Sequence, residues 1–435
     1  MKKAMIITYG CAMNVNESAK IKKMLMNMGY TMTETLEECD LVFLNTCTVR
    51  EGAAVQIYGK LGELKQLKEN RGAIIGITGC FAQEQGEALG KKFPTIDIIM
   101  GNQNIGKIPE AIDRIETGNF KNVVYVENKD ELPSTLSAEF ESKYIATIPI
   151  AYGCNNYCTY CIVPYVRGRE RSVPMEEIIS EVKTYIDRGY KEIILIGQNV
   201  NSYGKEKKDG SSFSKLLIAL NALEGEFWIR FISPHPRDFT DDVIEAIAVS
   251  EKVAKNIHVP VQAGSSRILK LMNRGYSKED YLFLIDKLKT KIPDIGISTD
   301  IIVGFPGETE EDFLDTLDVV EKVQYENSYM FMYSIRKGTK AAEMTEQISE
   351  EVKNERLQRL IKIQTLASKN TSNNYFEKTL TILVEGESKK NKEMLTGRTS
   401  TNKVVIFKGT SEMIGTFVKI KVNECKTWTL YGEIV

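Results

Sequence analysis

The stretch Gly153-Cys154-Asn155-Asn156-Tyr157-Cys158-Thr159-Tyr160-Cys161 places three cysteines within eight residues, with the spacing C-x-x-x-C-x-x-C. Thiolates are the protein ligands of iron–sulfur clusters, and a [4Fe–4S] cluster takes four of them. No fourth cysteine follows nearby, so one iron would keep an open coordination position. An open iron can bind the amino and carboxylate groups of S-adenosylmethionine (SAM) and pass one electron to its sulfonium. The stretch therefore predicts a radical-generating cluster.

A zinc site, a disulfide and a purely structural role each fit this stretch less well. A zinc site usually has two C-x(2–4)-C pairs at a distance, which give four ligands. A disulfide needs an oxidising compartment, and nothing in the chain indicates one. A buried structural role accounts for a single cysteine but not for three so close together.

Length and composition limit the class of protein. The chain has 435 residues, enough for two to four domains at about 150 residues each. Its 42% hydrophobic and 27% charged residues are ordinary for a soluble globular protein, and its net charge of −2 indicates no partner. No apolar run approaches the ~20 residues of a membrane span, and the apolar part of residues 1–10 is too short for a signal peptide. We expect a cytoplasmic protein in a reducing compartment, with no membrane contact.

Residues 1–125 are predicted to form a parallel α/β sheet domain, because apolar runs alternate with helical patterns. The expected strands are 4–9, 41–44 and 73–78, and the expected helices are 17–28, 51–68 and 83–91. Cys11, Cys47 and Cys80 each follow one strand, at the sheet edge where open α/β sheets place their ligands. This repeated position predicts a second [4Fe–4S] cluster with an open iron. The alternative is three separate cysteines at helix starts, where the dipole favours a thiolate.

Polar residues 127–135 read as a linker, and residues 140–370 as a second domain. Six strand patterns separated by helices predict a partial (β/α)6 barrel, with its chemistry at the carboxyl ends of the strands. The strands are expected at 147–152, 192–197, 228–233, 256–261, 296–304 and 328–334. Candidate SAM contacts at this edge are Tyr160, Gln198, Asn199, Gln262 and Asp300, each of which has loop capping as its alternative. His258 is expected to be a satisfied barrel residue.

The C-terminal part changes its hydrophobic period. Residues 350–368 predict an amphipathic helix whose apolar stripe contains Val352, Leu357, Leu360, Ile361 and Leu366. Residues 371–435 are predicted to form a small five-stranded β-barrel, with strands at 380–385, 395–399, 404–408, 416–422 and 427–434. From Lys378 onward there are 10 Lys+Arg and 6 Asp+Glu, a balance of +4 that suits nucleic acid or a solvated surface.

Smaller signals complete the interpretation. Arg167, Arg169 and Arg171 follow the cysteine stretch and suit either a phosphate-bearing substrate or a solvated basic loop. Cys39, in an acidic stretch, and Cys425, far from the other cysteines, are expected to be structural.

The whole chain resembles the radical-SAM methylthiotransferases, which have an N-terminal methylthiotransferase domain, a radical-SAM core and a C-terminal TRAM domain. The matching segments are Tyr9–Asn14, Asn45–Cys47, Gly79–Cys80, Gly153–Cys161 and Ile162–Gly168. His258–Ser265, Leu271–Tyr276 and Ser298–Thr309 resemble the branch that acts on N6-dimethylallyladenosine in tRNA. Ala12 replaces the usual Gln and Val173 the usual Arg, but neither change removes a ligand.

The resemblance implies 2-methylthiolation of N6-dimethylallyladenosine next to the tRNA anticodon, at tRNA position 37. Cys154, Cys158 and Cys161 would hold the SAM-cleaving cluster, and Cys11, Cys47 and Cys80 the auxiliary cluster that supplies sulfur. The implied partners are a tRNA carrying N6-dimethylallyladenosine and an electron donor such as flavodoxin or ferredoxin, and we expect a monomer. One alternative is a sister methylthiotransferase that acts on threonylcarbamoyladenosine in tRNA or on a ribosomal-protein aspartate. A non-enzyme alternative is an RNA-binding iron–sulfur redox sensor, but a sensor needs no open iron for SAM.

Overall fold

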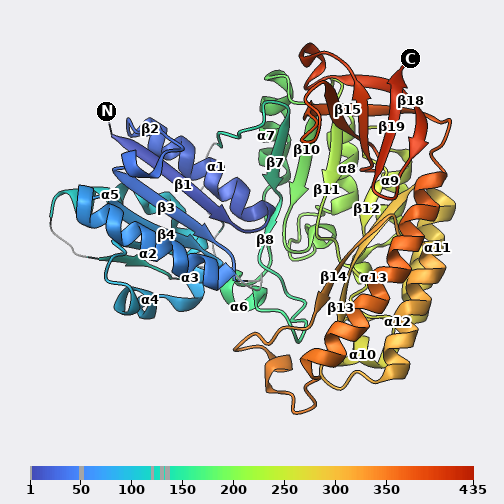
Figure 1. Ribbon diagram of the computed structural model, residues 1–435, viewed down its shortest axis with the longest axis horizontal. Coiled ribbons are helices and arrows are strands. Elements are labelled where there is room, and N and C mark those ends of the chain that lie inside the picture. The colour runs from blue at the N-terminus through green and yellow to red at the C-terminus, as the bar shows by residue number, and fades with distance from the viewer. Residues whose placement is uncertain (1, 49–52, 119–121, 128–131, 133–137) are drawn as a thin grey trace. The chain divides into compact units, whose positions relative to one another are not determined.

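The computed structural model describes residues 2–48, 53–118, 122–127, 132 and 138–435 (Figure 1). The chain divides into two compact units. The first contains residues 1–142, 151–155 and 161–173, and the second contains residues 143–150, 156–160 and 174–435. The predicted linker at 127–135 lies outside the described residues except for residues 127 and 132, and so does the start of the helix predicted at 51–68.

The first unit is built on a six-stranded parallel sheet with the order β2-β1-β3-β4-β5-β6, which confirms the predicted α/β domain. In β3 all six side chains are buried, because helices cover both faces of a parallel sheet and a central strand then reads as one apolar run. The strands are β1 (Lys3–Tyr9), β2 (Thr31–Met32), β3 (Leu41–Thr46), β4 (Ile74–Gly79), β5 (Ile98–Met100) and β6 (Val123–Tyr125). The helices are α1 (Ala12–Asn27), α2 (Ala53–Arg71), α3 (Cys80–Gln85), α4 (Glu87–Lys92) and α5 (Ile108–Glu116).

The first unit also includes two short segments from the middle of the chain, residues 151–155 and 161–173. Strand β8 (Ala151–Tyr152) pairs antiparallel with β9 (Arg171–Ser172), and the short helix α6 (Val163–Arg167) lies between them in sequence. Ile162 and Val166 pack with Cys80 in one apolar cluster, so the segment 161–173 contacts the sheet edge that carries Cys80.

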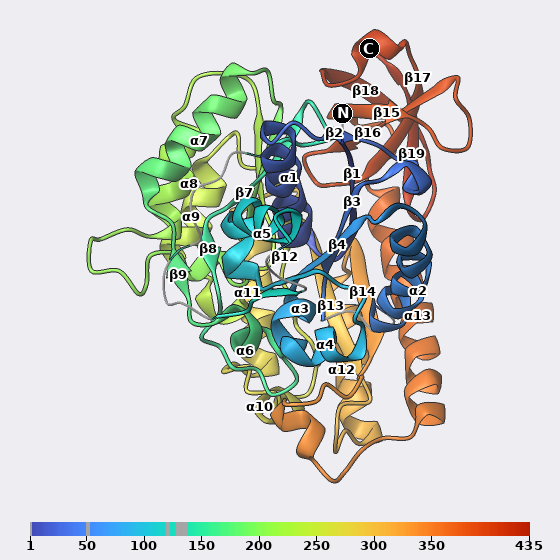
Figure 2. The ribbon, with the colours of Figure 1, turned by 90° about the vertical axis from the view of Figure 1, so that its left-hand side faces the viewer.

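The second unit contains the predicted six barrel strands as two three-stranded parallel sheets, β7-β10-β11 and β12-β13-β14. Figures 1 and 2 show helices along the outer side of these strands. The strands are β7 (Ile145–Pro149), β10 (Glu192–Ile196), β11 (Trp228–Phe231), β12 (Asn256–His258), β13 (Gly296–Val303) and β14 (Asn327–Met332). The helices are α7 (Met175–Asp187), α8 (Phe213–Asn221), α9 (Asp241–Val249), α10 (Ser266–Leu271), α11 (Lys278–Lys291) and α12 (Glu310–Val323).

Helix α13 (Glu350–Asn373) corrects one prediction. Of the expected apolar stripe, Leu360 is buried and Leu357 partly buried, but Val352, Ile361 and Leu366 are exposed. The buried face is mostly polar. Buried polar groups are tolerated where each finds a partner. Arg356 Nη1 donates to Glu308 Oε2 over 2.7 Å, and Gln364 Nε2 donates to the Tyr325 carbonyl over 3.0 Å. Specific hydrogen bonds therefore fix the rotation of this helix.

The C-terminal strands close into a barrel with the order β15-β16-β17-β19-β18, as predicted. The strands are β15 (Thr379–Glu387), β16 (Met394–Thr399), β17 (Val404–Lys408), β18 (Phe417–Cys425) and β19 (Thr429–Ile434). This barrel belongs to the second unit, and Arg230 ties it to the core. Arg230 Nε donates to Glu192 Oε2 over 2.8 Å, and its Nη2 donates to the Thr399 carbonyl over 2.7 Å.

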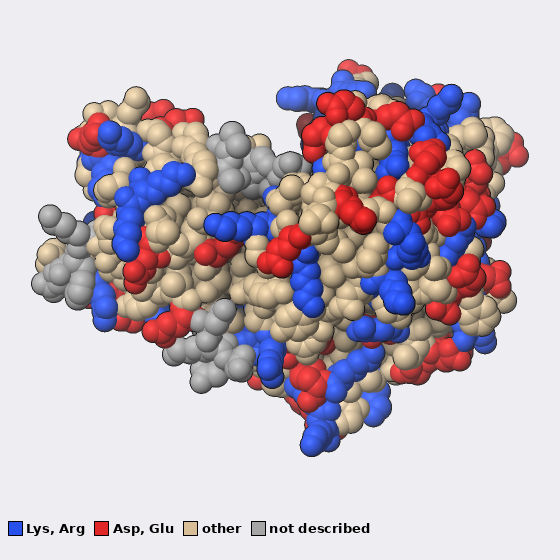
Figure 3. All heavy atoms as spheres, turned by 90° about the horizontal axis from the view of Figure 1, so that it is seen from below, with Lys and Arg blue, Asp and Glu red and all other residues tan. Residues whose placement is uncertain are grey.

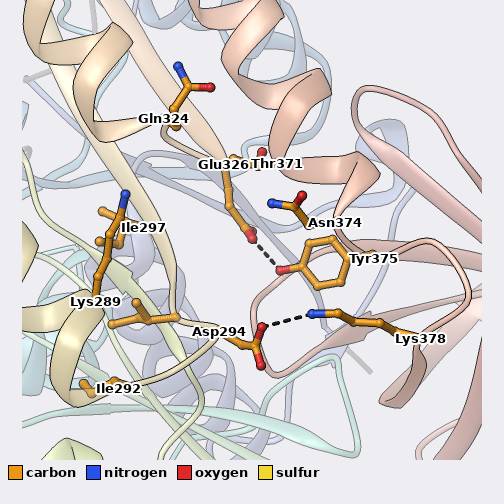
Figure 4. A pocket seen from close by; sticks show the side chains of 11 residues that line it. Lys289, Ile292, Asp294, Ile297, Gln324, Glu326, Thr371, Asn374, Tyr375 and Lys378 are labelled. Atoms are coloured by element: carbon orange, nitrogen blue, oxygen red, sulfur yellow. Dashed lines mark hydrogen bonds and ion pairs between the residues drawn. The ribbon is translucent and has the colours of Figure 1, made fainter.

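A cavity of about 280 Å³ marks the joint between α13, the small barrel and the amino ends of β13 and β14 (Figure 4). Figure 4 shows the Tyr375 hydroxyl pointing at the Glu326 carboxylate. It also shows Lys378 pointing at Asp294, with Lys378 Nζ 3.0 Å from Asp294 Oδ1. Burial raises the pKa of Glu326, although the nearby Lys403 opposes the shift. Barrel chemistry lies at the opposite, carboxyl ends of the strands, so we interpret this cavity as part of a structural joint.

Candidate functional site

Cys11, Cys47 and Cys80 lie at the carboxyl edge of three adjacent strands, as predicted. The register places Tyr9 beside Thr46 and Thr46 beside Gly79, and the Cys47 amide donates to the Tyr9 carbonyl over 2.8 Å. Figures 1 and 2 show β1, β3 and β4 running side by side. Neighbouring strands are about 4.8 Å apart, so residues that follow paired positions are brought close together.

Gly79 is required for this arrangement, because it sits between β4 and Cys80 with φ +99° and ψ −169°. This region of backbone space is almost restricted to glycine. A Cβ at residue 79 would lie 2.1 Å from the Thr46 carbonyl oxygen and 2.7 Å from the Thr46 nitrogen. The glycine therefore allows the turn before Cys80 to approach the backbone before Cys47.

Electrostatics also link the three thiols. Burial raises the pKa of the Cys80 thiol to about 11, the Arg167 guanidinium opposes this shift, and Cys47 and Cys11 are among the groups whose charge adds to it. Asn102 Nδ2 donates to Cys80 Sγ over 3.6 Å. Together with the strand register, this coupling is consistent with one shared environment for the three cysteines.

Arg167 is fully buried, which overturns both predictions for it, phosphate binding and a solvated loop. Its Nη1 donates to Glu17 Oε1 over 2.9 Å, and its buried Nη2 has no hydrogen-bond partner. Burial works against its charge, but Cys80, Glu17 and Cys11 hold the pKa of Arg167 well above the usual range. A buried guanidinium with an unpaired donor near Cys80 and Cys11 fits an anionic cluster with thiolate ligands.

The polar residues near these thiols form hydrogen bonds with backbone groups and with one another. Asn14 Oδ1 accepts from the Cys11 amide over 3.2 Å and from its thiol over 3.4 Å, while Asn14 Nδ2 donates to Asn45 Oδ1 over 2.8 Å. Thr46 Oγ1 donates to the Thr78 carbonyl over 2.6 Å. These bonds hold the ends of adjacent strands together at the cysteine edge.

The part of the Cys154–Cys161 loop in the first unit is held by the returning chain before β9. The Cys154 amide donates to the Gly168 carbonyl over 3.2 Å, and the Glu170 amide donates to Asn155 Oδ1 over 3.2 Å. Gly153 has φ +79°, and a Cβ there would lie 2.1 Å from the Arg169 carbonyl oxygen. A glycine is therefore needed directly before the first cysteine.

The part of the loop in the second unit, residues 156–160, is held by residues 271–276. Asn273 Nδ2 donates to the carbonyls of Asn156 and Tyr157, each over 3.1 Å. The Thr159 amide donates to the Met272 carbonyl over 3.1 Å, and its hydroxyl donates to the Leu271 carbonyl over 2.9 Å. Backbone and side-chain bonds thus fix the residues on both sides of Cys158.

Arg274 completes these contacts, and the sequence pattern did not predict its role. Its Nη1 donates to Cys158 Sγ and to the Tyr160 hydroxyl, each over 3.4 Å. The only signal for it was its place in the segment Leu271–Tyr276, because the residue types alone give an ordinary loop arginine. A buried cation beside the sulfur of Cys158 fits the thiolate donor set of an iron–sulfur cluster.

Of the candidate SAM contacts, Gln198 and Asn199 follow β10, Gln262 follows β12, Asp300 lies within β13 and Tyr160 belongs to the cysteine loop. Their role stays a prediction. Gln262 is buried with φ +70°, its amide donates to the Asp300 carbonyl over 2.9 Å, and its carbonyl accepts from the Ile302 amide over 2.8 Å. Gln198 is partly buried, while Asn199 is buried and donates to Asp238 over 2.7 Å.

His258 is a satisfied barrel residue, as predicted. Its Nε2 is 3.2 Å from Asp300 Oδ2, and its Nδ1 is 3.1 Å from Ser298 Oγ. Both ring nitrogens therefore have partners, and one oxygen of the Asp300 carboxylate faces the imidazole. Cys39 is likewise structural, since its fully buried thiol donates to the Thr35 carbonyl over 3.4 Å.

Among the described residues, no group of three His, Cys, Asp or Glu side chains is arranged to hold a single metal ion. A cubane cluster separates its thiolates more widely than one ion separates its ligands, because four irons and four sulfides lie between them. The two cysteine triads therefore stay predicted cluster ligands. No helix of the described chain combines the length and apolar character that a membrane crossing requires.

Three family models match the chain in the order of its parts: "Uncharacterized protein family UPF0004" at residues 3–101, the Radical SAM superfamily at 148–320 and the TRAM domain at 375–435. A tRNA-2-methylthio-N(6)-dimethylallyladenosine synthase from Fusobacterium nucleatum subsp. nucleatum is 66% identical over 435 residues, which covers 100% of both chains. This chain belongs to the tRNA-2-methylthio-N(6)-dimethylallyladenosine synthase family. A synthase of the same name from Thermoanaerobacter pseudethanolicus is 49% identical and covers 99% of this chain and 92% of its own.

Solved structures agree with this family in fold. A radical S-adenosylmethionine methyltransferase, TsrM, from Kitasatospora setae matches with a TM-score of 0.57 and 13% identity, over 79% of this chain and 77% of that chain. The cobalamin-dependent S-adenosylmethionine radical enzyme OxsB matches with a TM-score of 0.53 and 11% identity, over 83% of this chain and 56% of that chain. At these identities the likeness shows the fold alone.

Proposed function

We propose that this protein is a radical-SAM methylthiotransferase that adds a methylthio group to carbon 2 of N6-dimethylallyladenosine at position 37 of tRNA. The observation that carries the proposal is the approach of Cys11, Cys47 and Cys80 at one sheet edge in a chain that also has the Cys154, Cys158, Cys161 spacing. Membership of the synthase family, with 66% identity over the full length, supports the same substrate.

The chemistry explains why two thiol triads are needed. Carbon 2 of adenine has an unactivated C–H bond, which acid–base catalysis does not break at a useful rate. When bound, a [4Fe–4S] cluster with SAM supplies a 5′-deoxyadenosyl radical that can abstract this hydrogen, and a second cluster supplies sulfur. The triad in residues 154–161 would hold the first cluster, and Cys11, Cys47 and Cys80 the second. Residues of the barrel edge would exclude water and orient SAM and the base.

The protein's own residues give each triad a rigid frame. Asn273 and Thr159 fix the loop around Cys158, while Gly79 and the strand register set the spacing of Cys47 and Cys80. Tyr160, Gln198, Asn199, Gln262 and Asp300 are the proposed SAM contacts. Asp300 can accept from SAM through the oxygen that does not face His258.

The proposed partners are tRNA and a one-electron donor such as flavodoxin or ferredoxin. On the face shown in Figure 3, lysines and arginines are interspersed with acidic residues. Long-range attraction from net charge is therefore small, and we expect tRNA affinity to depend on local groups, including the small C-terminal barrel with its balance of +4.

The experiment that tests the cluster assignment compares the two triads in the full-length chain. Replacing Cys154, Cys158 and Cys161 together by Ala is expected to abolish 5′-deoxyadenosine formation and to remove about half of the iron. Replacing only Cys47 by Ala is expected to remove a similar share of iron and to spare SAM cleavage. If the triple variant still forms 5′-deoxyadenosine, or if single changes among Cys11, Cys47 and Cys80 lower iron independently and additively, the assignment is wrong.

A further inference from the structure

Arg274 lies in a position that the proposed reaction does not yet explain. It has 4% of its surface exposed, and it follows Asn273 in the segment that holds the cysteine loop. Its Nη2 donates to the Pro260 carbonyl over 2.9 Å, and its Nε donates to the Tyr276 hydroxyl over 2.9 Å. These two bonds fix the plane of the guanidinium and leave Nη1 directed at Cys158 Sγ, 3.4 Å away.

The charge of this arginine needs an anionic partner. Among the described residues no Asp or Glu forms an ion pair with Arg274, and its Nη1 instead donates to Cys158 Sγ and to the Tyr160 hydroxyl. Other buried arginines of the second unit are paired with carboxylates, as Arg230 is with Glu192 and Arg356 with Glu308. A buried charge without a counterion is costly, so an anion at Cys158 would complete the site.

We propose that Arg274 is a positioning residue that raises the reduction potential of the SAM-cleaving cluster through its N–H···S contact with Cys158. The inference rests on the proposed function, because it takes Cys158 as a cluster ligand. A positive charge and a hydrogen bond to a ligand sulfur stabilise the reduced cluster, which carries one more negative charge. One electron from an external donor converts [4Fe–4S]²⁺ to [4Fe–4S]⁺, and Arg274 keeps its proton throughout.

The fixed plane of the guanidinium matters as much as its charge. An ammonium group is a compact point charge on a flexible stem, and it cannot reproduce donors in a rigid fork. Lys at residue 274 would keep the charge near Cys158 but lose part of the directed contact. Gln would lose the charge. The two replacements therefore separate the effect of charge from that of geometry.

The test is a redox titration of the full-length, reconstituted chain, followed by electron paramagnetic resonance. All variants are made in a Cys47→Ala background, so that only the loop cluster contributes to the signal. We expect the midpoint potential to fall in Arg274→Gln and to fall less in Arg274→Lys. The matched control is Arg267→Gln on α10, which removes an ion pair with Asp312 and contacts no cysteine. Its potential should equal that of the parent chain.

Each outcome decides the proposal. An unchanged potential in Arg274→Gln overturns it. If this variant does not retain the cluster, Arg274→Lys decides in its place, since a lowered potential supports the proposal and an unchanged one refutes it. Loss of the cluster from both variants with the fold retained, by circular dichroism, would make Arg274 a requirement for assembly and would also refute it. The titration uses no tRNA, so a wrong substrate leaves the result unaffected, whereas a parent chain without a loop cluster would refute the proposed function.

Discussion

Replacing Gly79 by Ala tests whether the turn before Cys80 creates the auxiliary site. The new Cβ would lie 2.1 Å from the Thr46 carbonyl oxygen, well inside van der Waals contact, and no side-chain rotation can separate a Cβ from a backbone oxygen. The φ of +99° and ψ of −169° cost a side chain about 1–3 kcal/mol, and the overpacking costs a further ~1–3 kcal/mol. Relief of the clash requires β3 and β4 to separate at the end that carries Cys47 and Cys80.

The consequence is expected at the cluster rather than in the whole fold. The middle of the summed cost, about 4 kcal/mol, is below a total stability of about 5–15 kcal/mol, so we expect the chain to stay folded. The two thiols, however, would lie too far apart to share one cluster. After anaerobic reconstitution, iron and sulfide per chain should fall by about half, because one of two cubanes is lost. Formation of 5′-deoxyadenosine should persist, because the other triad lies in a different loop.

Gly72→Ala is the matched control for this experiment. Gly72 precedes the same strand and has φ +70°, but a Cβ there meets no atom within 4 Å. It therefore has the cost of a left-handed backbone without the clash, and its iron content should equal that of the unchanged chain. If Gly79→Ala binds as much iron as Gly72→Ala, the structural reasoning about the sheet edge is refuted.

Three further predictions concern the second unit. Arg230→Met should lower the unfolding free energy by about 3–5 kcal/mol, because it removes the hydrogen-bonded partner of the buried Glu192 and leaves the longer contact of 3.9 Å with Arg398. The loss is measured as a lower melting temperature, and an unchanged one would contradict it. Replacing the three lysines of loop 389–392 by Ala should weaken tRNA binding. The slope of log affinity against log salt concentration should fall by roughly one unit per lost phosphate contact. An unchanged slope would mean that tRNA does not contact this loop. Burial raises the pKa of Glu308 to about 7 from 4.5, so its contribution to stability is full below pH 4.5 and is lost as the pH rises through 7. In Glu308→Gln the unfolding free energy should therefore depend less on pH between 4.5 and 7. The same pH dependence in the variant and the unchanged chain would contradict the raised pKa of Glu308.

Much of the fold could be predicted because apolar periodicity reports burial directly. The strands before Cys11, Cys47 and Cys80 are continuous apolar runs in a sheet covered on both faces, and five alternating strands indicated the closed barrel. Strands β5 and β6 were missed, because three residues are too few to show a period.

The errors came from polar residues that the fold buries. Arg167 looked like a surface arginine, but Glu17 on a distant helix gives it a partner that no local pattern indicates. The predicted stripe of α13 did not include Arg356 and Gln364, yet they bind Glu308 and a backbone carbonyl in the core. Arg274 was overlooked for the same reason. Buried ion pairs depend on tertiary contacts, and residue type alone predicts exposure for them.

The measurement that tests the central claim most directly is mass spectrometry of nucleosides from tRNA of a strain that lacks this protein. The account predicts that 2-methylthio-N6-dimethylallyladenosine disappears and N6-dimethylallyladenosine accumulates. The unchanged chain should restore the product, and the Cys154, Cys158, Cys161 triple variant should not. If the methylthio product persists in the deletion strain, or if a methylthio derivative of threonylcarbamoyladenosine disappears instead, the proposed substrate is contradicted.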